Sequence, residues 1–109
     1  MAIVCCIDYR LDPFRLADFE RYAEQWAEAI PGAGGDLIGY FMPHEGANYV
    51  GMALIGFDSL AAYEVYRTRL KATAAGKANF DFARDNHFIL KERRTFLRPV
   101  PSTYLTGKA

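Results

Sequence analysis

The chain has 109 residues, 51% of them hydrophobic, and its formal net charge is zero. This length predicts a single domain, and the hydrophobic content suffices for a packed core and excludes a disordered chain. Nucleic-acid binding is disfavoured because it requires clustered Lys and Arg side chains, and the sequence has no basic block. We find no signal-peptide pattern and no apolar run of about 20 residues, so we expect a cytoplasmic protein without a membrane partner.

The first predicted strand covers residues 2–9, and a long amphipathic helix follows it. Asp12 is expected to cap this helix, with Pro13 at its first position, where a missing N–H does no harm. The helix should run to about Ile30, with Trp26 on its apolar stripe, and the Pro-Gly dipeptide that follows should end it.

The most apolar part of the chain predicts two strands, 37–43 and 48–57, joined by a short loop that contains His44 and a glycine. The second of these strands is apolar on both faces, with Tyr49 on one of them, so both faces must be covered. An amphipathic helix comes next, and its apolar side is rich in tyrosine. The residues at helical spacing are Leu60, Tyr63, Tyr66, Arg67 and Leu70.

After this helix, residues 72–78 are expected to be flexible, and residues 79–87 should form a short third helix or an irregular turn. Residues 88–99 predict the last strand. Its many charges indicate an exposed edge strand, with Arg93 and Arg94 in solvent. The domain is therefore predicted to span residues 1–101, and residues 102–109 to form a tail.

The order β-α-β-β-α-β predicts an α+β fold of the ferredoxin-like type, a four-stranded antiparallel sheet with both main helices on one face. The other face of the sheet is also apolar along the first and third strands. Soluble monomers avoid a large exposed apolar patch. A second copy of the chain is the expected cover, which would give a homodimer with sheet packed on sheet.

Three stretches resemble the NIPSNAP family of the dimeric α/β-barrel superfamily. They are YRLDPFRLADFERYAEQW, GFDSLAAYEVYRTRL and ILKERRTFLRPVP, and the likeness extends over residues 2–101. The resemblance implies that two ferredoxin-like domains form a dimeric α/β barrel. It implies little about the reaction, since the wider superfamily includes monooxygenases that use haem or no cofactor, as well as small isomerases. A fold does not settle chemistry.

The candidate ligand site is an aromatic cleft between sheet and helices. Arg67 lies near the apolar stripe of its helix, where an arginine must find a carboxylate, a ligand or water. Either it binds an anionic group of a ligand, or Glu92 or Asp8 pairs with it in an internal salt bridge. His87 precedes the last strand and could open onto the cleft, or could be structural. The candidate ligand-binding residues are Tyr49, Tyr63, Arg67, His87 and Trp26.

Two functions from different classes fit these residues. The first is a small dimeric module that binds an apolar or aromatic molecule, which could also carry an acid, with oxygenation or isomerisation as its enzymatic form. The second is a structural or interaction protein in which the tyrosines only pack. The two histidines stand alone, with no His-x-x-x-His or Cys-x-x-Cys spacing, so we expect no metal and no cofactor.

Overall fold

The computed structural model of the protein describes residues 1–103. Within this range, four strands and three helices follow one another, and a short 3-10 turn comes last. The elements are β1 Ile3–Leu11, α1 Leu16–Gly32, β2 Asp36–Phe41, β3 Val50–Phe57, α2 Leu60–Ala72, α3 Ala74–Asn86, β4 Ile89–Leu97 and η1 Pro101–Thr103.

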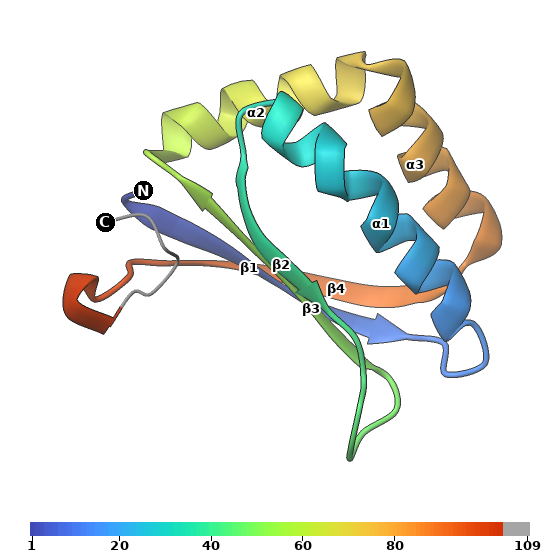
Figure 1. Ribbon diagram of the computed structural model, residues 1–109. Coiled ribbons are helices and arrows are strands. Elements are labelled where there is room, and N and C mark those ends of the chain that lie inside the picture. The colour runs from blue at the N-terminus through green and yellow to red at the C-terminus, as the bar shows by residue number, and fades with distance from the viewer. Residues whose placement is uncertain (104–109) are drawn as a thin grey trace.

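The strands form one antiparallel sheet in the order β2-β3-β1-β4. Figure 1 shows α1, α2 and α3 together on one face of this sheet. This arrangement confirms the predicted α+β ferredoxin-like fold. The sheet does not close on itself, because β2 and β4 are edge strands. A single chain is therefore an open sheet, and a barrel would require a second copy.

The strand register decides which side chains face the helices. Ile7 on β1 pairs with Ala53 on β3 and Arg94 on β4, and all three belong to the face that the helices cover. The next residue along β1, Asp8, pairs with Arg93 on the other face. Because successive side chains of a strand alternate between faces, the two neighbouring arginines of β4 lie on opposite sides of the sheet.

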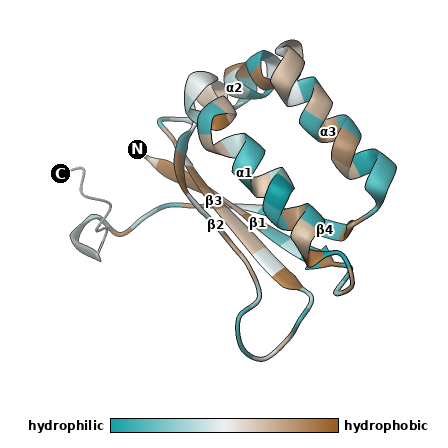
Figure 2. Cartoon of the chain, turned by 45° about the vertical axis from the view of Figure 1, so that its right-hand side comes forward, coloured by the Kyte–Doolittle hydropathy of each residue, from teal (hydrophilic) through white to brown (hydrophobic). Residues whose placement is uncertain are grey.

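The core lies between the sheet and the helices and is dominated by aromatic rings. Phe19 of α1, for example, is fully buried and makes an edge contact with the ring of Tyr9 on β1. Figure 2 shows hydrophobic colour along much of β1 and β3, and more hydrophilic colour on outward parts of the helices. The largest fully buried side chains are Trp26, Tyr9, Phe19, Phe88, Leu11, Ile30 and Cys5.

The predicted start of the first helix is wrong. Helix α1 begins at Leu16, and its N-terminus has no side-chain cap. Asp12 instead closes a turn: its carboxylate accepts the N–H of Phe14 at 2.9 Å, and its carbonyl accepts the N–H of Arg15 at 3.0 Å. Aspartate followed by proline is as typical of a β-turn as of a helix start, and here the turn forms.

The loop between β2 and β3 is longer than expected and leaves Tyr49 outside the sheet. Strand β2 ends at Phe41, and β3 begins only at Val50. Tyr49 is 43% exposed, and the guanidinium of Arg10 lies 5.1 Å from the centre of its ring. The prediction that Tyr49 lies within the strand is therefore wrong.

Residues 74–86 form a regular helix, whereas the sequence predicted a flexible segment and a short helix or turn. Thr73 starts α3 by accepting the N–H of Gly76 on its hydroxyl at 3.0 Å. A Cβ atom at position 76 would lie 1.9 Å from the carbonyl oxygen of Leu70, so only glycine permits this tight junction of α2 and α3. Asn79 then ties α3 to α1, because its amide donates to the carbonyl of Tyr22 at 2.9 Å.

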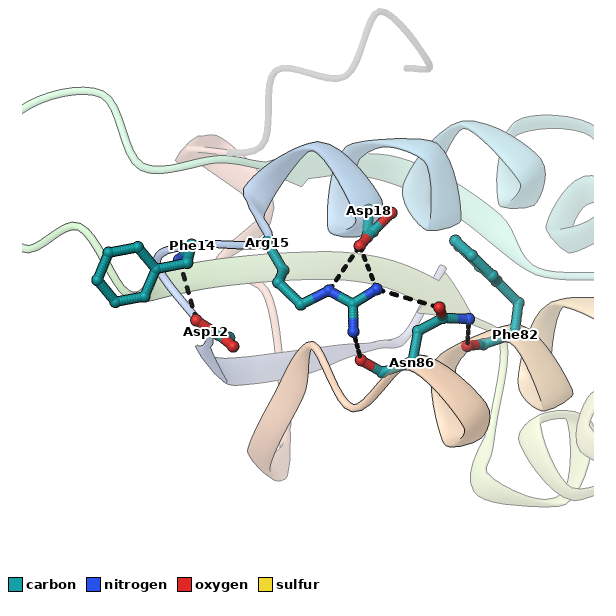
Figure 3. A network of polar contacts seen from close by, with 6 residues as sticks. All are labelled: Asp12, Phe14, Arg15, Asp18, Phe82 and Asn86. Atoms are coloured by element: carbon teal, nitrogen blue, oxygen red, sulfur yellow. Dashed lines mark hydrogen bonds and ion pairs between the residues drawn. The ribbon is translucent and has the colours of Figure 1, made fainter.

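The far end of α3 is held by Arg15, as Figure 3 shows. This side chain donates to the carboxylate of Asp18 at 2.8 Å, to the side-chain oxygen of Asn86 at 3.0 Å and to the main-chain carbonyl of Asn86. His87 follows with a left-handed backbone, φ 53°, and ends the helix. The network positions the C-terminus of α3 against the start of α1.

The chain beyond β4 forms the short turn Pro101–Thr103. Residues 104–109 lie outside the described part of the chain, so the predicted division into a domain of residues 1–101 and a tail of residues 102–109 stays a prediction.

Candidate functional site

A cavity of about 30 Å³ lies between the sheet and the helices. A volume of this size holds about two water molecules or one small functional group. Its walls are mainly aromatic and aliphatic, with several polar tips. The described lining residues are Cys5, Ile7, Tyr9, Tyr22, Trp26, Ile30, Tyr40, Ile55, Tyr63, Tyr66, Arg67, Leu70, Lys71, Phe80 and Arg94.

Two buried N–H donors in this lining have no protein acceptor within residues 1–103: Trp26 Nε1 and Arg94 Nε. Burial raises the pKa of the Tyr22 phenol, and the nearby indole N–H of Trp26 opposes this rise in part, although the two groups do not meet in hydrogen-bond geometry. Most buried donors in proteins are paired, so each exception calls for an explanation. Two unpaired donors in the lining of one cavity indicate a site that can bind a hydrogen-bond acceptor from outside the protein.

Arg94 is the charged group of the site. It projects from β4 toward the helices and is 28% exposed. Its Nη1 donates to the Tyr63 hydroxyl at 2.9 Å, and its Nη2 lies 3.4 Å from the carboxylate of Glu92. Burial acts to lower the pKa of Arg94, but the Glu92 carboxylate and the Tyr63 hydroxyl outweigh it and the pKa is raised. The guanidinium is therefore charged at any physiological pH.

Burial keeps four phenols around the cavity protonated. Burial raises the pKa of Tyr66 and of Tyr22, and it raises the pKa of Tyr9 and of Tyr40 well above the usual value. The hydroxyls of Tyr9 and Tyr40 share a long contact of 3.3 Å. Burial likewise raises the pKa of the Cys5 thiol. These groups can therefore donate hydrogen bonds, but none is poised to remove a proton near neutral pH.

Basic side chains predominate in the lining of the cavity. Arg67, Lys71 and Arg94 line it, and the described lining residues include no aspartate or glutamate. Arg67 and Lys71 lie on the exposed side of α2, and the Arg67 guanidinium sits 5.8 Å from the centre of the Tyr63 ring. Since the whole chain is neutral, this is a local concentration of positive charge. A cleft in which one sign of charge predominates attracts ions of the other sign.

The structure brings three of the five predicted ligand-binding residues together. Trp26, Tyr63 and Arg67 all line the cavity. Tyr49 does not, because it lies in the exposed loop before β3. His87 is exposed at the C-terminal cap of α3 and does not line it either. Whether the three residues in the cavity bind a ligand stays a prediction.

Sequence reasoning missed Arg94, and its expected place in solvent is wrong. The signal was present, because alternation along β4 places Arg94 on the same face as the apolar Phe96. Conversely, Arg67 has no ion pair within the described residues and is exposed, so the expected internal salt bridge with Glu92 or Asp8 does not form. Those two carboxylates pair with arginines of β4 instead.

Two classes of site find no support in residues 1–103. No group of three or more His, Cys, Asp or Glu side chains comes together in a way that could hold a metal ion. No helix in the same range is both long and apolar enough to cross a membrane.

Comparison with solved structures gives close matches of fold. A NIPSNAP family protein of unknown function from Agrobacterium tumefaciens is 22% identical with a TM-score of 0.78, over 90% of this chain and 87% of that one. A NIPSNAP-like domain protein from Burkholderia xenovorans is 25% identical with a TM-score of 0.72, over 90% and 84%. A candidate antibiotic biosynthesis monooxygenase from Nitrosomonas europaea is 9% identical with a TM-score of 0.69, over 90% and 98%.

Among curated proteins, the comparison finds no match to this sequence. The family model for NIPSNAP, in contrast, matches residues 4–103, which include every strand and helix described above except the first residue of β1. The chain therefore belongs to the NIPSNAP family.

Proposed function

We propose that this NIPSNAP protein is a homodimeric module that binds a small apolar or aromatic molecule between its sheet and its helices. One observation carries the proposal: Trp26 and Arg94 both line the cavity, and the buried N–H donors Trp26 Nε1 and Arg94 Nε lack a protein acceptor within residues 1–103. A core that served packing alone would pair or exclude such groups, because each costs about 1–3 kcal/mol when unpaired.

The size of the cavity limits how a ligand can bind. Pockets that enclose whole small molecules measure roughly 300–1,000 Å³, whereas this cavity measures about 30 Å³. Only one group of the ligand fits inside. The rest would lie at the rim, where Arg67 and Lys71 are exposed.

Binding can be tested with thermal shift measurements against aromatic acids, flavin, haem and quinones. A ligand at 100 times its dissociation constant should stabilise the native state by about 2.7 kcal/mol. The variant Cys5→Ile would fill the cavity and should abolish the shift, because Cys5 lines it. Cys6→Ile is the matched control, since Cys6 lies on the opposite face of β1. Absence of stabilisation by every compound would contradict the proposal.

The homodimer is proposed from the face of the sheet that the helices leave open. Strand alternation and register place apolar side chains from all four strands on that face. Phe41 is 48% exposed there and Leu97 is 53% exposed. A second copy would bury this face and could complete the dimeric barrel. The apolar residues of the open face are Val4, Cys6, Phe41, Val50, Met52, Leu54 and Leu97.

Light scattering during size-exclusion chromatography tests this assembly. We expect the mass of two chains at micromolar concentration, and Phe41→Asp should shift it toward one chain because a buried unpaired carboxylate is unfavourable. Phe14→Asp is the matched control, since Phe14 is 94% exposed in the turn before α1. A wild-type protein with the mass of a single chain would contradict the dimer.

Catalysis is the second candidate, and one observation favours a particular form of it. Fold likeness to a candidate monooxygenase at 9% identity shows the fold alone. The cavity offers hydrogen-bond donors and a guanidinium, however, and such groups stabilise a developing oxyanion. The raised pKa values of the Tyr9, Tyr40 and Tyr66 phenols argue against a proton-abstracting role for them.

We also propose a cytoplasmic location for the protein, because the free thiols of Cys5 and Cys6 suit a reducing compartment.

A further inference from the structure

We propose that the group bound in the cavity is a carboxylate, which takes the Nε–Nη2 edge of Arg94 and displaces Glu92 from it. The inference rests on the proposed function, because it names the chemical class of the ligand for that same cavity.

The hydrogen bonds of Arg94 point to this edge. Nη1 is occupied by the Tyr63 hydroxyl at 2.9 Å. Nη2 reaches the Glu92 carboxylate only at 3.4 Å, and Nε has no acceptor within residues 1–103. The N–H groups of Nε and Nη2 run parallel on one edge of the planar guanidinium, and this edge matches the two oxygens of a carboxylate. The edge best suited to a carboxylate is thus the one that the protein fills least well.

The other groups of the cavity also favour an anion with acceptor oxygens. The indole N–H of Trp26 is a second donor without an acceptor in the described chain. Arg67 and Lys71 add positive charge at the rim, and among the described residues Glu92 is the carboxylate that lies against the Arg94 guanidinium. A neutral amide would offer one acceptor oxygen and bring N–H groups of its own toward a site that already has a surplus of donors.

The volume of the cavity and the exposure of the Glu92 side chain are consistent with the replacement of Glu92 by a ligand carboxylate. A planar carboxylate is the size of group that about 30 Å³ accommodates, while the body of the acid would extend to the rim. The Glu92 side chain is 38% exposed, so it can turn into solvent when a ligand replaces it. In the absence of a ligand, the Glu92 carboxylate would occupy the Nη2 position of Arg94 with a long contact.

Isothermal titration calorimetry with benzoate and phenylacetate against benzamide and phenylacetamide tests the inference. We expect each acid to bind at least about tenfold more tightly than its amide, equivalent to about 1.4 kcal/mol. Arg94→Lys should keep the charge but weaken acid binding about tenfold, because lysine lacks the two-donor edge. Glu92→Gln should tighten acid binding several-fold, because it removes the competing carboxylate. Arg93→Lys is the matched control and should leave binding unchanged.

The outcomes separate this inference from the proposed function. Equal affinity for acids and amides would overturn the carboxylate while leaving a ligand-binding cavity. Tighter binding of phenyl phosphate than of benzoate would overturn it in favour of a tetrahedral anion. If acids, amides, haem, flavin and quinones all fail to bind, both proposals fall. If Arg94→Lys does not fold, the Glu92→Gln variant decides the question. Acid binding that is unchanged or weaker in Glu92→Gln would contradict the displacement of Glu92 by the ligand.

Discussion

The two faces of the sheet are made by the same strands, yet a charged side chain meets a different environment on each. Arg93 and Arg94 show the difference most clearly. Arg93 is 78% exposed on the open face and lies 3.4 Å from the Asp8 carboxylate. Arg94 is 28% exposed on the covered face, among tyrosines and with one N–H unpaired. The side chains are identical, and only their position in the strand alternation differs.

On the open face of a single chain a charge is solvated, and an ion pair contributes at most about 1 kcal/mol to stability. On the covered face a charge is desolvated, and every donor without an acceptor weakens the native state. Arg94 therefore occupies a position where stability alone favours an apolar residue. Its presence there is the strongest sign that this face does more than pack.

The largest contrast between the faces should appear in alkali. An unfolded tyrosine ionises near pH 10, whereas burial raises the pKa of four phenols of the covered face above that value in the native state. A raised native pKa means that unfolding releases the proton above about pH 10, so stability is intact below this pH and falls as the pH rises toward the native values. We expect a loss of about 1.4 kcal/mol per phenol for each pH unit in that interval. The phenols are Tyr9, Tyr22, Tyr40 and Tyr66.

Phenolate absorbance and far-ultraviolet circular dichroism, recorded together during an alkaline titration, measure this effect. The buried phenols should ionise in one step that coincides with loss of helix signal. Ionisation of all tyrosines near pH 10, with the fold retained, would show that the covered face is open to solvent and would remove the contrast.

The same contrast can be measured with two phenylalanines. Phe19 is fully buried against the helix-facing side of β1, so Phe19→Ala should lower the free energy of unfolding by about 3–5 kcal/mol. Phe41→Ala on the open face should lower it by no more than roughly 1 kcal/mol in a single chain, because the Phe41 ring is 48% exposed. Urea denaturation monitored by tryptophan fluorescence measures both. Equal losses would mean that the open face is packed within one chain.

A third contrast uses two strand glycines. A Cβ atom at Gly51 would lie 3.0 Å from Leu11 and 3.1 Å from Phe19, both fully buried and unable to move away. Gly51→Ala should therefore cost about 1–3 kcal/mol by overpacking. At Gly39 the Cβ would lie 3.0 Å from the end of the exposed Phe41 ring, which can turn aside. Gly39→Ala should change stability by less than about 0.5 kcal/mol. Thermal unfolding of both variants measures the difference, and similar losses would contradict it.

The strands and the overall fold could be predicted from the sequence because the apolar runs of the chain are compatible with few other secondary structures. Residues 50–57 contain no charged side chain, and a run of this length and composition favours a strand over a helix. The details that failed depend on local competition. Asp12 serves a turn and a helix start equally well, and Gly76 looked like a sign of flexibility although it permits a tight helix junction.

The site was harder to predict because charge and alternation conflicted there. The charges of β4 suggested solvent for Arg94, whereas its position in the strand placed it toward the core, and the alternation prevailed. The reverse holds for Arg67, which lies near an apolar stripe but extends along its helix to solvent. A long cationic side chain can follow either course, and packing of the neighbouring elements decides between them.

The smallest expected effect is also the one that bears most directly on function. Arg94→Met removes a partly buried charge that has one unpaired donor and a long ion pair, and methionine fills a similar volume with a flexible apolar chain. We expect the free energy of unfolding to rise by about 1 kcal/mol, since well-packed apolar replacements of such buried charges are often stabilising. Arg93→Met, the matched control, should change it by less than about 0.5 kcal/mol, because it removes only an exposed ion pair. Chemical denaturation at neutral pH compares the two. A loss of several kcal/mol in Arg94→Met would make this arginine a structural support, whereas a gain in stability would mean that the chain keeps Arg94 for what it binds.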